Sequence, residues 1–262
     1  MSSPDTGPPT PDTPAVRVNG LSFRYAGGPP TLRDISFELH PGERVGLVGP
    51  SGAGKSTLLM HLNGLLPRTH AATNGRAAVA IHGQPVNRDT LPTVRQQVGF
   101  LFQDPDDQLF CPTVAEDVAF GPLNLALPTE EVHERVRISL EQVGLSGFER
   151  RSTMRLSDGE RKRVGLAGVL ACQPSILVLD EPTSNLDPRA RRSLLGHLGA
   201  FQGTQLIATH DLDFVVLHCS RVLILDAGEI HADGPTERIL RNAALMEQHG
   251  LEVPLRLLGD RE

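Results

Sequence analysis

A glycine-rich run that ends in a lysine is the stretch of this sequence best suited to chemistry. It fits the pattern G-x-x-x-x-G-K-[S/T] and comprises Gly49, Pro50, Ser51, Gly52, Ala53, Gly54, Lys55, Ser56 and Thr57. Small residues let backbone N–H groups close around a polyphosphate, and a helix N-terminus adds positive potential. Lys55 would reach the β- and γ-phosphates, and the Ser56 hydroxyl would hold Mg²⁺. The pattern predicts a site for a nucleoside triphosphate and Mg²⁺.

The flanking residues decide between a phosphate loop and a glycine-rich turn with an exposed lysine. Residues 43–48 are typical of a buried strand, and residues 58–64 predict a helix that ends at a glycine. A phosphate loop requires this strand–loop–helix setting, so we favour the loop.

Acidic residues and a histidine follow two other apolar runs. Residues 176–181 are apolar up to Asp180 and Glu181, which is typical of a parallel strand buried on both faces. Residues 205–208 form a similar run before His210, and ligands bind at this carboxyl edge of open α/β sheets. Asp180 can hold Mg²⁺ through its water shell, and Glu181 can polarise a water for in-line attack on the γ-phosphate. The alternatives are a surface carboxylate at Glu181 and a structural or surface histidine at His210.

Three further positions could complete such a site. His210 could contact the γ-phosphate and position the attacking water. Gln103, after the apolar run 98–102, could contact the metal ion or that water. Ser157 opens a predicted helix, with Glu160 at the spacing of a capping box. A capped helix N-terminus is also an anion site, so a structural and a phosphate-binding role are compatible.

The remaining sequence predicts the strands and helices that hold the carboxyl edge of this sheet in place. Alternating apolar residues predict antiparallel strands at 16–25 and 35–39, joined by a turn at 27–30. Residues 113–170 are predicted to be mostly helical, which suggests a subdomain inserted between strands. The other predicted elements are strands at 77–81 and 98–102, helices at 129–143 and 188–198, and a hairpin of 221–226 with 229–232. Residues 235–262 are predicted to form one short helix and an irregular, partly helical tail. We therefore predict an α/β fold: a P-loop NTPase (RecA-like) core with an antiparallel β layer and an inserted α-helical subdomain.

Composition narrows the functional classes. Of the 262 residues 39% are hydrophobic, which can supply a core, and the net charge of −6 offers no electrostatic footprint for nucleic acid. No apolar run approaches the ~20 residues that span a bilayer, and the N-terminus does not resemble a secretory signal. Cys111, Cys172 and Cys219 form no C-x-x-C pair, so we expect reduced thiols in a cytosolic protein, not a metal site or disulfides.

The order of these motifs indicates a family more specifically than any one motif does. The phosphate loop is followed by Gln103, residues 156–160, residues 180–181, residues 182–187 and His210. In this order the chain resembles the nucleotide-binding subunit of ABC transporters over essentially residues 15–240, with the helical subdomain at about 105–170. A tail rich in Pro, Ser, Thr and Asp at 1–14 is expected to be disordered, and residues 241–262 to form a partly helical tail.

This resemblance implies further roles around ATP. Tyr25 would stack on adenine, and Asp187 would belong to the nucleotide site. Ser157 and Gly159 would bind the γ-phosphate of an ATP held by a second subunit, so that two ATPs are sandwiched in a head-to-tail dimer. ATP hydrolysis with Mg²⁺ is the activity that the family implies.

The sequence departs from the family's usual L-S-G-G-Q motif. Asp158 replaces its first glycine, and Glu160 replaces its glutamine. A carboxylate near a phosphate repels it unless the carboxylate points away or is paired, so the strength of the nucleotide sandwich is an open question. The basic run that follows, residues 161–163, is interpreted as a solvated helix face.

A second and narrower resemblance extends over residues 102–110 and 116–122, supported by residues 61–64 and 209–213. These segments are similar to the ATPase of energy-coupling-factor importers, most of all to the cobalt/nickel (CbiO-type) branch. The resemblance implies a homodimer, or a dimer with a homologous ATPase, which binds transmembrane coupling and substrate-binding subunits. It also implies a peripheral protein on the cytoplasmic face of the cell membrane, with no nucleic-acid partner.

An acidic turn follows Gln103. Asp104, Asp106 and Asp107 repel one another unless cations are supplied. We expect basic residues of a membrane subunit to bind there; the alternative is a solvated turn.

Three other functions fit less of the sequence. A vitamin importer would use the same ATPase. A soluble ABC ATPase acting on DNA or ribosomes would show a coiled coil, a second nucleotide-binding domain or a basic surface. A small-molecule kinase with a phosphate loop would leave the motifs at Ser157 and His210 unexplained.

Overall fold

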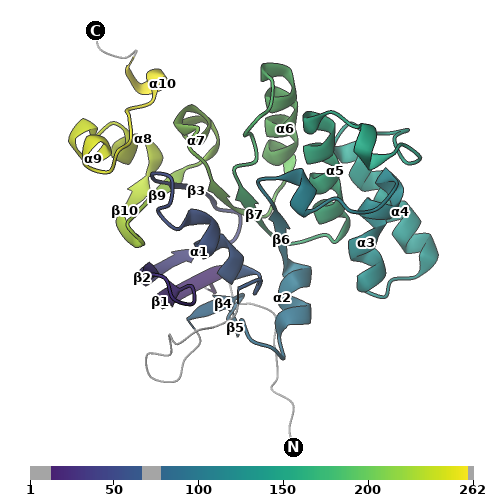
Figure 1. The fold of residues 1–262 in the computed structure, drawn as a ribbon, viewed down its shortest axis with the longest axis horizontal. Helices are drawn as coiled ribbons and strands as arrows, with labels where there is room; N and C mark the ends of the chain where they lie inside the picture. The colour runs from purple at the N-terminus through teal and green to yellow at the C-terminus, as the bar shows by residue number, and fades with distance from the viewer. Residues whose placement is uncertain (1–12, 67–77, 259–262) are drawn as a thin grey trace, which may run out of the picture.

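The computed structural model describes residues 13–66 and 78–258 (Figure 1). The tail predicted at 1–14 therefore lies outside the described residues, apart from Thr13 and Pro14. Two sheets are formed, one of four strands in the order β2-β1-β4-β5 and one of six in the order β10-β9-β3-β8-β7-β6. The predicted α/β fold with a phosphate-loop core and an antiparallel layer is confirmed.

The four-stranded sheet is antiparallel. It contains β1 (Val16–Arg24), β2 (Pro30–Leu39), β4 (Val79–Ile81) and β5 (Gln84–Pro85). Along β1, buried and more exposed residues alternate, because successive side chains point to opposite faces of a sheet. The buried face packs on α1 (Lys55–Leu62).

The six-stranded sheet contains the parallel strands whose carboxyl ends carry the candidate site residues. Its strands are β3 (Arg44–Val48), β6 (Val98–Leu101), β7 (Ile176–Asp180), β8 (Thr204–Ala208), β9 (Arg221–Asp226) and β10 (Glu229–Pro235). The first five run parallel, and β10 returns antiparallel beside β9. Ala208 on β8 pairs with Leu47 on β3 and with Asp180 on β7, so these three strands end side by side.

Helices cover the sheet and form the inserted subdomain. The subdomain helices α3 (Val114–Asn124), α4 (Thr129–Gln142) and α5 (Asp158–Ala171) lie together beyond β6, with α5 against the other two (Figure 1). The helices α6 (Pro188–Ala200) and α7 (Leu212–His218) connect the central strands. The helix α2 (Leu91–Gln97), which the sequence patterns did not predict, precedes β6. In the described ranges, no helix combines the length and the hydrophobicity needed to cross a bilayer.

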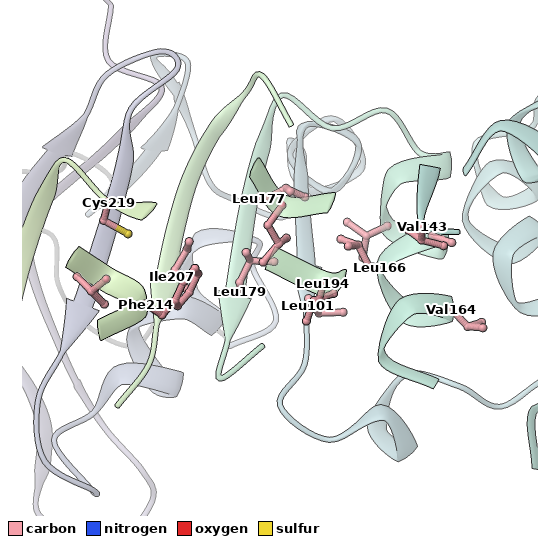
Figure 2. Close-up of a cluster of buried hydrophobic side chains, with 14 of the residues drawn as sticks. Leu101, Val143, Val164, Leu166, Leu177, Leu179, Leu194, Ile207, Phe214 and Cys219 are labelled. Atoms are coloured by element: carbon pink, nitrogen blue, oxygen red, sulfur yellow. The ribbon is translucent and has the colours of Figure 1, made fainter. Parts of the chain in front are cut away.

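The buried strand β7 separates two hydrophobic clusters. Leu177 and Leu179 belong to the cluster under α5, α6 and α7 shown in Figure 2, while Ile176 and Val178 face the cluster under α1 and the antiparallel layer. Burial on both faces explains why this strand is apolar at every position. Cys219 lies in the first cluster, and all three cysteines are unpaired in the structure.

The C-terminal segment is partly helical, which agrees with the sequence prediction. It forms α8 (Thr236–Leu240), then α9 (Ala243–Gln248) and α10 (Leu255–Leu258) within the predicted tail. Asn242 caps α9 by accepting a hydrogen bond from the backbone N–H of Leu245. Buried Leu240 and Met246 anchor the segment, and such short helices depend on this packing rather than on helical periodicity.

Candidate functional site

The phosphate loop lies between β3 and α1, and two of its glycines are required by geometry. A Cβ added to Gly49 would stand 1.8 Å from the carbonyl oxygen of Leu225, so no larger residue fits. Gly54 precedes α1 with φ of 105°, a left-handed conformation that favours glycine. These two glycines therefore allow a tight backbone path for the loop that larger residues would block.

Lys55 folds back onto this loop. Its Nζ donates hydrogen bonds to the carbonyl oxygens of Gly49 at 2.7 Å and Pro50 at 3.0 Å. Burial lowers the pKa of Lys55, and the carboxylates of Glu181 and Asp180 act in the opposite direction. The ammonium is thus held at the loop, close to two acids at the end of β7.

Asp180 and Ser56 meet as hard oxygen donors. Asp180 is 5% exposed and has the Ser56 hydroxyl as a near neighbour. Burial raises the pKa of Asp180, and the nearby Ser56 hydroxyl lowers it. A hydroxyl and a carboxylate beside a phosphate loop are the donor set that Mg²⁺ prefers, so these residues fit that ion.

Glu181 and His210 form a direct pair across neighbouring strand ends. Oε2 of Glu181 lies 2.8 Å from Nδ1 of His210 and also accepts the His210 backbone N–H at 3.3 Å. Glu181 has φ of 45°, and its own N–H donates to the carbonyl oxygen of Ala208 at 2.8 Å. The Glu181 side chain is 11% exposed and that of His210 is 73% exposed, so the pair joins a shielded carboxylate to an open imidazole.

Tyr25 and Gln103 flank this centre. The Tyr25 hydroxyl lies 3.2 Å from Oγ1 of Thr57, and its ring, in edge-to-face contact with Phe23, is 46% exposed. Gln103 follows β6 and lines a depression of about 490 Å³ together with Asp158 and Lys162. The Tyr25 ring is therefore available for stacking, and Gln103 lies on the side of β7 away from the phosphate loop.

The N-terminus of α5 carries a complete capping box. The Ser157 hydroxyl and N–H both donate to Oε2 of Glu160, at 2.9 and 2.8 Å, and the Glu160 N–H donates back at 3.3 Å. The bond from the Ser157 N–H lowers the pKa of Glu160, and Arg151 lies 3.8 Å away. Glu160 is thus paired inside its own helix. Gly159 packs on Ala190, where an added Cβ would stand 2.7 Å from that side chain.

Asp187 is used as a helix cap. Its Oδ1 accepts the N–H groups of Arg189 at 2.8 Å and Ala190 at 2.9 Å, and these bonds lower its pKa. The structure thus gives Asp187 a clear role in starting α6, and a contact of Asp187 with nucleotide stays a prediction.

Comparison with known proteins identifies this arrangement. A family model described as ABC transporter matches residues 32–184. The chain belongs to the ABC transporter family. It is 51% identical over 242 residues to a protein of Gloeobacter violaceus named as an ABC transporter ATP-binding protein, covering 92% of this chain and 97% of that one.

Two further relatives define the type of ABC subunit. The energy-coupling factor transporter ATP-binding protein EcfA of Methanothermobacter thermautotrophicus is 46% identical over 244 residues, or 91% of this chain and 76% of that protein. The structure of cbiO1 from Clostridium perfringens, part of the ABC transporter complex cbiONQ, matches with a TM-score of 0.77 and 33% identity over 90% of this chain and 94% of that one. This ABC subunit is therefore an ATPase of the energy-coupling-factor type.

The basic run of this ABC subunit is not a solvated face, so that prediction was wrong. Lys162 is 3% exposed, and its Nζ donates to the carbonyl oxygens of Glu181 at 3.1 Å and Ser184 at 2.8 Å and to the Ser184 hydroxyl at 2.9 Å. Burial lowers the pKa of Lys162. Its spacing of four from buried Leu166 was the available signal, because residues i and i+4 share a helix face.

Two carboxylates of the acidic turn, those of Asp104 and Asp106, also have partners within the chain. Arg161 forms an ion pair with Asp106, and Asp104 accepts the Asp106 N–H at 2.9 Å to cap the short 3-10 helix Pro105–Asp107. The cation that this turn needs is therefore supplied by α5. This finding removes the argument that the turn must wait for basic residues of a membrane subunit.

Replacing Lys162 with methionine is expected to lower the free energy of unfolding by about 1–3 kcal/mol, because three buried or partly buried acceptors lose a donor. Urea titration of nucleotide-free protein measures this. The matched control is Asp106→Asn, which weakens a surface pair at the same helix and should change stability by less than about 1 kcal/mol. Equal effects of the two variants would contradict the anchoring role of Lys162.

Proposed function

We propose that this site binds ATP with Mg²⁺ and hydrolyses it to drive an energy-coupling-factor importer. The observation that carries the proposal is the pairing of Glu181 with His210 next to the Ser56–Asp180 pair. Asp180, Glu181 and His210 lie at the carboxyl ends of β7 and β8, and Ser56 lies in the first turn of α1, just after the phosphate loop. The residues proposed to activate the water, to bind the metal ion and to bind the phosphates therefore lie at the same edge of the six-stranded sheet.

The roles of the side chains follow from their chemistry. Lys55 would exchange its two loop carbonyls for oxygens of the β- and γ-phosphates. Ser56, Asp180 and Gln103 would hold Mg²⁺, which when bound neutralises charge on the phosphates. Glu181 would take a proton from the attacking water. His210, bonded to Glu181, would orient that carboxylate and contact the γ-phosphate.

A second subunit would complete each site. Tyr25 would stack on adenine, and the exposed N-terminus of α5, with Ser157 and Gly159, would face the γ-phosphate of the partner's ATP. Capping commits the Ser157 hydroxyl to Glu160, so the backbone N–H groups of this turn would supply the phosphate contact. The dimer would be formed by two copies of this chain or by this chain and a homologous ATPase, with Asp187 near the joint nucleotide site.

An exposed aromatic pair supports docking on a membrane subunit. Phe110 and Phe120 are 63% and 47% exposed and pack edge to face with ring centroids 4.7 Å apart. Together with Phe102 they line a depression of about 300 Å³ between β6 and the helical subdomain. Exposed aromatic groups beside a hollow are typical of partner sites. We propose that a helix of the transmembrane subunit binds here, on the cytoplasmic face of the membrane.

Cobalt or nickel is the proposed cargo, with a vitamin as the alternative. The resemblance to the CbiO-type branch and the likeness to cbiO1 support the metal ions. The test is to purify the chain with its co-expressed membrane subunits, reconstitute the complex in liposomes and measure uptake of labelled Co²⁺, Ni²⁺ and vitamins. Uptake of a vitamin but of neither metal would contradict the cargo proposal and leave the motor role intact.

The double variant Phe110→Ser with Phe120→Ser should abolish assembly with the membrane subunits while basal ATP hydrolysis by the isolated subunit survives, because the pair lies away from the phosphate loop. Co-purification and phosphate release measure the two effects. Leu255→Ser is the matched control, since Leu255 is 76% exposed on α10. Normal assembly of the double variant would exclude this surface as the docking site.

A further inference from the structure

A second cluster of metal-binding side chains lies at the β9–β10 hairpin. Asp226 ends β9, His231 lies on β10, and His249 follows α9. One ligand atom from each side chain lies within 4.8 Å of the others, and in the described ranges this is the one group of three His, Cys, Asp or Glu with that property. None of the three takes part in the proposed ATP chemistry.

The cluster is already ordered without an ion. His249 is 5% exposed, and its Nδ1 lies 2.9 Å from Oδ2 of Asp226. The exposed imidazole of His231 packs against that of His249 at a tilt of 33°, with ring centroids 4.4 Å apart, and its Nε2 lies 3.2 Å from the Asp226 carbonyl oxygen. The buried His249 ring is thus held by the carboxylate, and the exposed His231 ring closes one side of the group.

We propose that Asp226, His231 and His249 bind one divalent transition-metal ion of the class that prefers imidazole, such as Zn²⁺, Co²⁺ or Ni²⁺. Two imidazoles and a carboxylate suit these ions, whereas Mg²⁺ and Ca²⁺ prefer oxygen ligands alone. Ligand bonds of about 2.0–2.2 Å require the three atoms to draw together from their present spacing. The exposed side of His231 leaves a fourth position for water.

Because of where the cluster lies, a bound metal ion would also connect two parts of the fold. Its ligands come from the hairpin and from the segment after α9, which lie side by side in Figure 1. The same hairpin packs on the phosphate loop, because the Gly228 N–H donates to the Ala53 carbonyl oxygen at 3.2 Å and the Leu225 carbonyl oxygen abuts Gly49. A bound ion would therefore tie the C-terminal segment to the element that supports the phosphate loop. This inference does not depend on the cargo of the importer.

The test uses tag-free, nucleotide-free full-length protein, since a histidine tag or ATP would bind the ion. Titration calorimetry with Zn²⁺, and absorption spectra with Co²⁺, should show one site per chain that excess Mg²⁺ does not displace. Loss of even an outer partner of a metal ligand costs about 10–100-fold in affinity, so His231→Ala should weaken binding by at least about 100-fold. Hydrogen exchange at 243–251 should slow when Zn²⁺ is added to the wild type but not to the variant.

The exposed position of His231 keeps the test interpretable, because its removal leaves the buried His249–Asp226 bond intact. His133→Ala, which removes an exposed histidine on α4, is the matched control and should bind Zn²⁺ like the wild type. A circular dichroism melt checks that both variants are folded. Absence of a stoichiometric site in the wild type, or unchanged binding by His231→Ala, would overturn the proposal and leave the His249–Asp226 bond as a structural tether alone.

Discussion

Replacing Glu181 with glutamine is expected to lower kcat for ATP hydrolysis by about 10²–10⁴-fold, the range that a general base contributes. The amide has the shape of the carboxylate, and its oxygen can still accept the hydrogen bond from His210, so the strand ends stay joined. It cannot take up a proton from water. ATP binding should therefore persist while turnover stops.

Three measurements distinguish this outcome from damage to the fold. Phosphate release reports kcat, calorimetry with ATP and Mg²⁺ reports affinity, and light scattering reports the ATP-bound dimer, which should accumulate in the variant. The matched control is Glu229→Gln, because Glu229 lies on β10 with a side chain 50% exposed and should leave kcat unchanged. Normal hydrolysis by Glu181→Gln would remove Glu181 from the mechanism, and a strictly monomeric variant would count against the nucleotide sandwich.

Replacing Lys55 with alanine is expected to weaken ATP binding by about 10²-fold or more. Hydrogen bonds to charged groups contribute about 1.5–3 kcal/mol each, and the ammonium would donate to two phosphates. The fold should tolerate the change, because the bonds from Lys55 to the carbonyl groups of Gly49 and Pro50 are only partly buried, so water can replace the ammonium there. Calorimetry measures the affinity, and Lys55→Arg should not restore it fully, since a planar guanidinium replaces a point charge.

The chain offers an internal reference for this prediction, because Lys55 and Lys162 are the two lysines of the sequence. ATP with Mg²⁺ should protect Lys55 from acetylation, as read by mass spectrometry. Lys162, whose donors are bound to backbone and hydroxyl oxygens, should react slowly with or without nucleotide. Acetylation of Lys55 that ATP does not change would contradict its place on the phosphates.

The sequence by itself determined the fold class and the positions of the candidate chemistry. The reason is local: the glycines of the phosphate loop allow one tight backbone path, and an apolar run ending in Asp180 and Glu181 forms a strand that carries its acids to the sheet edge. The predicted phosphate-loop core, antiparallel layer and ABC family are confirmed. The order of the motifs was enough to indicate the family, because each motif lies next to a strand or helix that the local sequence predicts.

Only the tertiary structure decided how side chains distant in sequence pair. Strand register brings Glu181 to His210, and the packing of α5 buries Lys162 and brings Arg161 to Asp106. Helical periodicity shows which residues share a face but not what that face meets, so a basic run was mistaken for a solvated surface.

The same limit applies to the C-terminal segment. The sequence predicted that it is partly helical, but such short helices are stabilised by packing, so their periodic pattern does not fix where each begins and ends. Asp226 and His249 are 23 positions apart and meet because α9 folds back along the hairpin. No local sequence pattern predicts this contact between Asp226 and His249, because it depends on the path of the chain between them.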